Sequence, residues 1–276
     1  RRSLMCSSAP PEEESRAERK RTRQSKREDP ALLALRAASA TACAPFVALG
    51  RAGELSAADA RRLTGGELLA GPCLCSPARS MALVRHHYTM SVSWALYTKE
   101  WMDALSGFLL RRGITRVLEV CAGLGALTEP MRARGLEWTA TDVHPQPVHP
   151  NAARPICEPI ECGAWSAVGR FASAQAVFWS WWQQDELDED FQVVWQCCQS
   201  GRPVIFVGEG EGGVTGSPML WRSGVPIEPF ADAAARHGET FYDVPCWPGC
   251  TDRTWIVAEP ACSVSLRLKA ATLEPM

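Results

Sequence analysis

The segment that most constrains the fold is an apolar strand pattern that runs directly into a glycine turn and then into a helix. Residues 117–125 read Val-Leu-Glu-Val-Cys-Ala-Gly-Leu-Gly. Glycine has no Cβ, so Gly123 and Gly125 allow a sharp turn and let a ligand approach the backbone closely. The N–H groups at the following helix start favour polar or anionic ligand groups. The next expected strand ends at Asp142, whose carboxylate is suited to accept hydrogen bonds from both ribose hydroxyls of a nucleoside.

Strand and helix patterns alternate along the rest of the chain. Short apolar runs of this kind suit parallel strands that are buried on both faces. We expect strands at residues 116–120, 138–142, 156–160, 176–179 and 204–207, and a closing antiparallel pair at 240–244 and 254–258. Amphipathic helices are expected at 98–112, 127–134 and 185–199. The fold class is therefore α/β: a doubly wound, mostly parallel seven-stranded sheet with an antiparallel C-terminal strand and helices on both faces.

Composition divides the chain into four parts. Residues 1–29 hold nine Lys/Arg, six Asp/Glu and few apolar residues, which is too little apolar surface to offset the entropy of ordering. We therefore expect a disordered basic and acidic tail over 1–30, and a helical or irregular extension over 31–80 with helices near 31–38 and 57–63. The patterned domain follows over 81–262, and residues 263–276 form a C-terminal tail. The basic run at 19–23 is interpreted as part of a solvated tail, with a nuclear address or a nucleic-acid contact as the alternatives.

The overall composition excludes several classes of protein. A net charge of -2 and a pI near 6.3 argue against nucleic-acid binding by the whole domain. We find no run near the ~18 to 20 apolar residues of a membrane-spanning helix, so no membrane partner is expected. Twelve cysteines in a chain of this length, without a secretory signal pattern, indicate free thiols in a reducing compartment. The expected location is cytoplasmic, with the nucleus as the alternative. The Cys73/Cys75 pair has no second pair nearby, so no metal site is expected.

The glycine loop also carries a family resemblance. Glu119-x-Cys121-x-Gly123-x-Gly125 resembles the Glu-x-Gly-x-Gly-x-Gly motif of class I (Rossmann-type) S-adenosylmethionine-dependent methyltransferases, with Cys121 where the family usually has its first glycine. Residues 93–100, 204–215, and 247–249 with Asp252 resemble one poorly characterised branch of this family. The resemblance covers roughly residues 90–260.

The resemblance implies S-adenosylmethionine as the cofactor. In that family the loop lies under the methionine end, and the acidic residue after the second strand holds the ribose. The residues that the resemblance and the expected strand ends place at the cofactor are Glu119, Cys121, Ala122, Gly123, Gly125, Asp142, Val143, Cys162 and Trp179. The adenine is expected near residues 161–164, with Trp165 as a cover.

The reaction is expected beyond the carboxyl ends of the strands. Residues 180–183 occupy the position of the Asp/Asn-Pro-Pro-aromatic motif of methyltransferases that act on nucleobase amino groups, but they contain neither the prolines nor the acid. We expect Trp181 or Trp182 to stack on a planar or cationic acceptor, with packing of the sheet edge as the alternative. Glu209, in a glycine-rich loop, is the third catalytic candidate. Further candidate bases are Glu211, Asp185 and His144.

The sequence thus predicts a monomeric methyltransferase whose acceptor is unidentified and is a small molecule, a protein or a nucleic acid. Two alternatives stay open. One is a catalytically silent, methyltransferase-like binding module. The other is a nicotinamide-dependent Rossmann oxidoreductase, which is disfavoured because Thr128 stands where the dinucleotide fingerprint has its third glycine.

Overall fold

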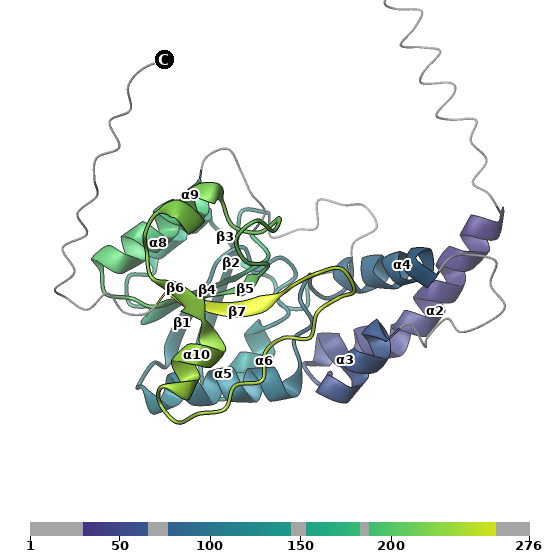
Figure 1. Ribbon diagram of the computed structural model, residues 1–276, viewed down its shortest axis with the longest axis horizontal. Coiled ribbons are helices and arrows are strands. Elements are labelled where there is room, and N and C mark those ends of the chain that lie inside the picture. The colour runs from purple at the N-terminus through teal and green to yellow at the C-terminus, as the bar shows by residue number, and fades with distance from the viewer. Residues whose placement is uncertain (1–29, 66–76, 145–152, 183–187, 258–276) are drawn as a thin grey trace, which may run out of the picture.

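The architecture is a seven-stranded sheet with helices on both faces (Figure 1). The computed structural model describes residues 30–65, 77–144, 153–182 and 188–257. The strands, in chain order, are β1 (Arg116–Glu119), β2 (Glu137–Asp142), β3 (Ile160–Glu161), β4 (Ala176–Ser180), β5 (Val204–Gly208), β6 (Ile227–Pro229) and β7 (Arg253–Val257). Their order across the sheet is β3-β2-β1-β4-β5-β7-β6.

The sheet confirms the predicted fold class. Strands β3, β2, β1, β4 and β5 are joined by parallel pairings. Strand β7 runs antiparallel to both of its neighbours, β5 and β6. Every residue of β5 is buried, which explains why this strand appears in the sequence as a continuous apolar run.

Two expected strands are wrong in position. The third strand is not 156–160 but only Ile160–Glu161, because Pro159 has no N–H to extend the ladder. The partner of β7 is β6, and not residues 240–244, which form no strand. Those residues are linked to β7 through a side chain instead, because the Asp243 carboxylate accepts hydrogen bonds from the backbone N–H and hydroxyl of Thr254.

Helices cover both faces of the sheet. On one face lie α5 (Lys99–Arg111), α6 (Thr128–Arg132) and α10 (Phe230–Ala235). On the other face lie α7 (Ala164–Arg170), α8 (Glu189–Gln199) and α9 (Pro218–Arg222). Helix α5 begins where predicted, because the Thr98 side chain accepts a hydrogen bond from the Trp101 N–H and caps the first turn. The crossover helix expected from residue 185 is observed as α8.

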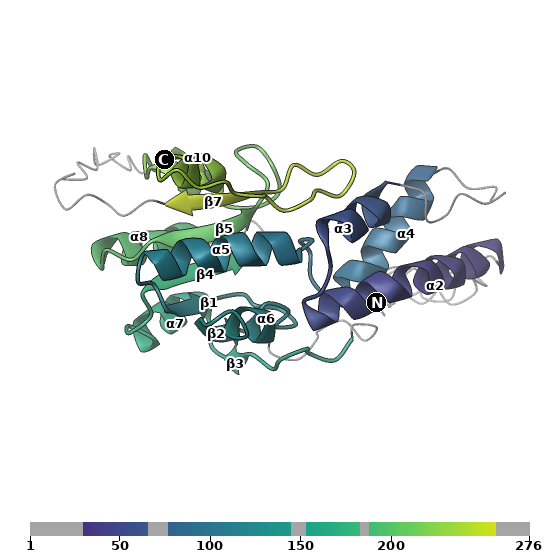
Figure 2. The same cartoon turned by 90° about the horizontal axis from the view of Figure 1, so that it is seen from below.

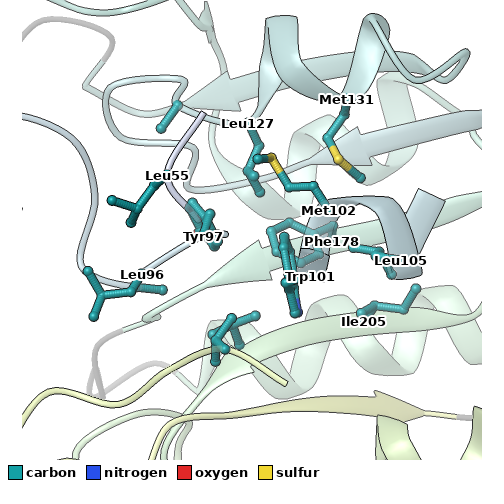
Figure 3. Close-up of a cluster of buried hydrophobic side chains, with 14 of the residues drawn as sticks. Leu55, Leu96, Tyr97, Trp101, Met102, Leu105, Leu127, Met131, Phe178 and Ile205 are labelled. Carbon is teal, nitrogen blue, oxygen red and sulfur yellow. The ribbon is translucent and has the colours of Figure 1, made fainter. Parts of the chain in front are cut away.

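Within the described residues, three further helices precede this α/β core: α2 (Pro30–Ala52), α3 (Ala57–Thr64) and α4 (Pro77–Thr89). They lie together beyond the strand ends on one side of the sheet, at the right of the view (Figure 2). Their apolar residues belong to the same buried cluster as α5 and one sheet face. Figure 3 shows Leu55 and Leu96 on one side of this cluster, with Tyr97 between them and the pair Trp101 and Phe178. Helices α2, α3 and α4 are therefore packed onto the core rather than separate from it.

Helix α2 is longer than predicted and is apolar over more of its length than expected. The sequence pattern predicts a helix over 31–38, but α2 extends to Ala52 and passes through Pro45. Its length and composition are sufficient to cross a membrane, contrary to the expectation stated above. Here it packs on α4, and its buried residues fall on one stripe: Leu35, Ser39, Cys43, Phe46 and Gly50.

Candidate cofactor and acceptor site

The loop after β1 is a tight turn built from left-handed residues. Cys121, Gly123 and Gly125 have φ values of 55°, 56° and 68°. Glycine adopts this conformation without cost, whereas a residue with a Cβ is strained by roughly 1–2 kcal/mol. Cys121 therefore occupies a position where the backbone favours glycine.

Gly125 is required by a close backbone approach. A Cβ at this position would lie 2.1 Å from the carbonyl oxygen of Cys157. The same chain segment donates a 2.8 Å hydrogen bond from the Ile156 N–H to the Leu124 carbonyl. Residues 156–157 thus close one side of the loop.

Asp142, at the end of β2, is bound to the glycine loop. Its carboxylate accepts a 2.8 Å hydrogen bond from the Gly123 N–H and another of 2.8 Å from the His144 N–H. Each carboxylate oxygen has a second lone pair, so Asp142 can also accept hydrogen bonds from a ligand. The predicted juxtaposition of the loop and this acid is present in the structure.

Glu119 is a buried carboxyl group beneath the loop. It is 3% exposed and accepts a 2.6 Å hydrogen bond from the indole N–H of Trp138. Burial raises the pKa of Glu119 to about 8; the Trp138 hydrogen bond opposes this shift, and the charge of Asp142 adds to it. At neutral pH the group is therefore mainly protonated and can act as a hydrogen-bond donor.

A pocket, here called the cofactor pocket, opens in front of this loop and encloses about 110 Å³. Its lining comes from the segment after α4, the end of β1, the glycine loop and the end of β4: Thr89, Val92, Ser93, Trp94, Tyr97, Glu119, Cys121, Ala122, Gly123, Leu124, Ala126 and Ser180. Sites for whole small molecules enclose roughly 300–1,000 Å³. The enclosed part therefore fits one end of a nucleoside cofactor.

The cofactor pocket offers polar groups that a ligand could use. The Ser180 hydroxyl is buried and completes no hydrogen bond of normal geometry among the described residues. Tyr97 lies beside it, and burial raises the pKa of Tyr97 well above its usual value. With Glu119 these hydroxyls can bind an ammonium or carboxylate group such as the amino-acid end of S-adenosylmethionine, so the residues present fit that cofactor.

The structure places the predicted cofactor residues in four settings. Glu119, Cys121, Ala122 and Gly123 line the cofactor pocket. Next to it lie Gly125 and Asp142, and the Cys162 N–H donates to the Asp142 carbonyl at 2.9 Å. Val143 is 57% exposed. Trp179 lies in the buried cluster of the opposite sheet face, stacked on Phe206, and does not line the pocket.

The predicted catalytic tryptophans occupy different faces of the sheet. Trp182 packs edge-on against Trp179 in the cluster beneath α8 and α9. Trp181 belongs to the cluster of the other face, has a left-handed φ of 53°, and stacks on Trp94 with ring centroids 5.5 Å apart. Only Trp181 therefore lies beside a residue of the cofactor pocket.

Glu209 accepts hydrogen bonds from residues of its own loop. Its carboxylate accepts a 2.9 Å hydrogen bond from the Val214 N–H, and its carbonyl accepts one from the Thr215 hydroxyl. Among the other candidate bases, His144 and Glu211 are exposed, and Asp185 lies outside the described residues.

A buried acid that the sequence analysis named for its family resemblance, but not as a site residue, lies beside Trp181. Asp252 is 2% exposed, and neither of its carboxyl oxygens completes a hydrogen bond within the described part of the chain. Burial raises the pKa of Asp252 to about 6, an effect opposed by the Trp181 indole and increased by the charge of Glu209. A usable signal was present, because Asp252 directly precedes the antiparallel strand β7, which begins at the edge where the parallel strands end.

A second pocket, here called the cap pocket, adjoins the cofactor pocket and encloses about 320 Å³. It is lined by Met81, Ala82, Arg85, His86, Thr89, Trp94 and Pro248, and so shares Thr89 and Trp94 with the cofactor pocket. Most of this lining comes from α4. The described residues contain no group of three or more His, Cys, Asp or Glu side chains arranged to hold a metal ion.

Comparison with known proteins gives only distant likenesses. No family model and no curated protein matches the chain. Magnesium protoporphyrin IX methyltransferase from Synechocystis, with bound S-adenosylmethionine, is 13% identical, covers 71% of this chain and 87% of its own, and has a TM-score of 0.34. The S-adenosylmethionine-dependent methyltransferase SibL, in its apo form, is 11% identical and has a TM-score of 0.33. The match covers 79% of this chain and 70% of SibL.

A third solved structure is an O-methyltransferase from neocarzinostatin biosynthesis in complex with S-adenosylhomocysteine and 1,4-dihydroxy-2-naphthoic acid. It is 13% identical, covers 78% of this chain and 70% of its own, and has a TM-score of 0.28. At these identities and TM-scores the likeness does not extend to an activity or an acceptor.

Proposed function

We propose that this protein is an S-adenosylmethionine-dependent methyltransferase. The observation that carries the proposal is the hydrogen bond between the Gly123 N–H and the Asp142 carboxylate. It ties the glycine loop, beneath which the buried Glu119 carboxyl lies, to the acid that would hold the ribose, at the carboxyl edge of the sheet where ligands of doubly wound folds bind.

Different residues would bind different parts of the cofactor. Glu119, Tyr97 and Ser180 would hold the amino-acid end in the cofactor pocket, and Asp142 would accept hydrogen bonds from the ribose. When bound, the cofactor would supply an electrophilic methyl group attached to a sulfonium. The main task of the protein is to hold the two reactants in line.

Calorimetric titration of the full chain tests this proposal. We expect saturable one-site binding of S-adenosylmethionine and of S-adenosylhomocysteine. NAD⁺ serves as the matched control, because a Rossmann oxidoreductase would bind it instead. Binding of NAD⁺ without binding of either sulfur compound would overturn the proposal.

A catalytically silent binding module is the second candidate. It is favoured by the small enclosed volume of the cofactor pocket, about 110 Å³. A silent module that had lost its cofactor site would show no heat on titration with either sulfur compound while remaining folded by circular dichroism.

A further inference from the structure

We propose that the cap pocket is the methyl-acceptor site and that it selects flat acceptors carrying an anionic group, which Arg85 binds. This inference rests on the proposed function and names the substrate class of the same site. The position of the pocket is the first argument. Because Thr89 and Trp94 line both pockets, a molecule in the cap pocket lies next to the end of the cofactor.

Trp94 provides the surface for a flat ligand. Its side chain is 44% exposed, although one side of the indole stacks on Trp181 with an angle of 23° between the rings. An exposed indole held in place by a second indole is a preformed stacking surface. Met81 and Pro248 add apolar walls to the same pocket.

Arg85 determines the charge that the pocket accepts. Arg85 and His86 are the titratable residues of its lining, which contains no carboxylate. Within the part of the chain that the structure describes, no carboxylate lies within ion-pair distance of Arg85. Its guanidinium carbon lies 5.3 Å from the centroid of the Trp181 ring. A guanidinium held in this way is suited to bind a carboxylate or phosphate through two parallel hydrogen bonds.

Two acids behind the pocket oppose this selectivity. The charges of Glu209 and Arg85 both act on Asp252: Glu209 raises the pKa of Asp252 and Arg85 lowers it. Neither acid lines the pocket, and Asp252 is buried. A ligand therefore contacts Arg85 directly and meets the two acids only at longer range. If the acids dominated instead, the pocket would prefer a cation, so the sign of the ligand charge is the decisive measurement.

Three probes with the same flat naphthalene ring and substituents of different charge test the proposal: 2-naphthoate, 2-naphthylmethanol and 2-naphthylmethylamine. Their affinities would be measured by calorimetry on the full chain, with and without S-adenosylhomocysteine. We expect the carboxylate to bind at least 10-fold more tightly than the alcohol and the amine. Equal affinities, preference for the amine or no binding of the carboxylate at millimolar concentration would each overturn the proposal.

Variants assign the preference to Arg85. In Arg85→Gln the preference for the carboxylate should fall to less than 3-fold, while the affinity for S-adenosylhomocysteine stays unchanged. Arg85→Lys keeps the charge and should retain part of the preference, which guards against a general loss of folding in the Gln variant. Trp94→Ala should weaken all three probes alike. The matched control is Arg222→Gln, an exposed arginine on α9, which should leave every affinity unchanged.

The two proposals fail in different ways. If the wild type binds no S-adenosylhomocysteine but keeps the preference for the carboxylate, the proposed function fails and the anion site stands. If it binds S-adenosylhomocysteine but shows no charge preference, the assignment of the acceptor class fails alone. Retention of the full preference in Arg85→Gln would also overturn the role of Arg85.

Discussion

The backbone N–H of Gly123 donates a 2.8 Å hydrogen bond to the Asp142 carboxylate, which ties the loop after β1 to the end of β2. The two residues are 19 positions apart, and the parallel pairing of β1 with β2 brings them to the same edge. Asp142 therefore shapes the loop and keeps lone pairs that can accept hydrogen bonds from a ligand.

Asp142→Ala should weaken binding of S-adenosylmethionine by roughly 10- to 100-fold. The reason is the loss of charge-assisted hydrogen bonds worth on the order of 1.5–3 kcal/mol. The fold should survive, because Asp142 ends a strand and is only partly buried. Asp142→Glu keeps the acceptor and should retain part of the affinity. Titration calorimetry on the three proteins decides the matter; an unchanged affinity in the Ala variant would place the ribose elsewhere.

Cys121→Gly should stabilise the protein by about 1 kcal/mol. Cys121 has a φ of 55°, and replacing it by glycine relieves roughly 1–2 kcal/mol of strain, less the entropy that glycine adds to the unfolded chain. Urea denaturation measures the change. Cys121→Ala is the control, because it removes the thiol but keeps the Cβ and should bring no gain. Equal stability of the Gly and Ala variants would contradict this account.

Gly125→Ala should destabilise the protein by at least 2 kcal/mol more than Gly123→Ala does. Both glycines have positive φ, so both variants carry similar backbone strain. At Gly125 the added Cβ also meets the Cys157 carbonyl at 2.1 Å, whereas at Gly123 it meets no atom within 4 Å. Chemical denaturation of both variants measures the free energy of unfolding, and the difference between them gives the cost of the contact with the Cys157 carbonyl. Similar losses in the two variants would show that the Cys157 segment moves aside freely.

Glu119→Gln should flatten the dependence of stability on pH between about 4.5 and 8. The folded protein holds the Glu119 proton up to about pH 8, whereas the unfolded chain releases it near pH 4.5. Unfolding therefore becomes easier as pH rises through this window, by up to about 1.4 kcal/mol per pH unit from this group. Glutamine has no proton to release. Urea unfolding at pH 5, 6, 7, 8 and 9 should show the two curves converging at low pH; parallel curves would refute the burial effect.

Much of the core could be predicted from local patterns. The buried run of β5, the Thr98 cap of α5 and the glycine turn after β1 each depend on residues that are neighbours in sequence, so each could be found there. The expected strand at 240–244 failed for the opposite reason. Its apolar residues suit a strand, but β7 is already hydrogen-bonded to β5 and β6, and only the folded sheet shows which segments occupy those positions.

The sequence by itself determined the buried strands β1, β2, β4 and β5, the helices α5, α6 and α8, and the glycine loop with its acid, because strand periodicity, turn chemistry and residue type are local properties. The tertiary structure alone decided which side chains share a pocket. Helix α4 brings Arg85 and Thr89 to the carboxyl edge of the sheet, Trp94 stacks on Trp181 87 positions later in the chain, and the reversal of β7 places Asp252 beside them. These contacts join segments far apart in sequence, and they arise because packing α4 and β7 onto the sheet buries the apolar surface that the core elements share.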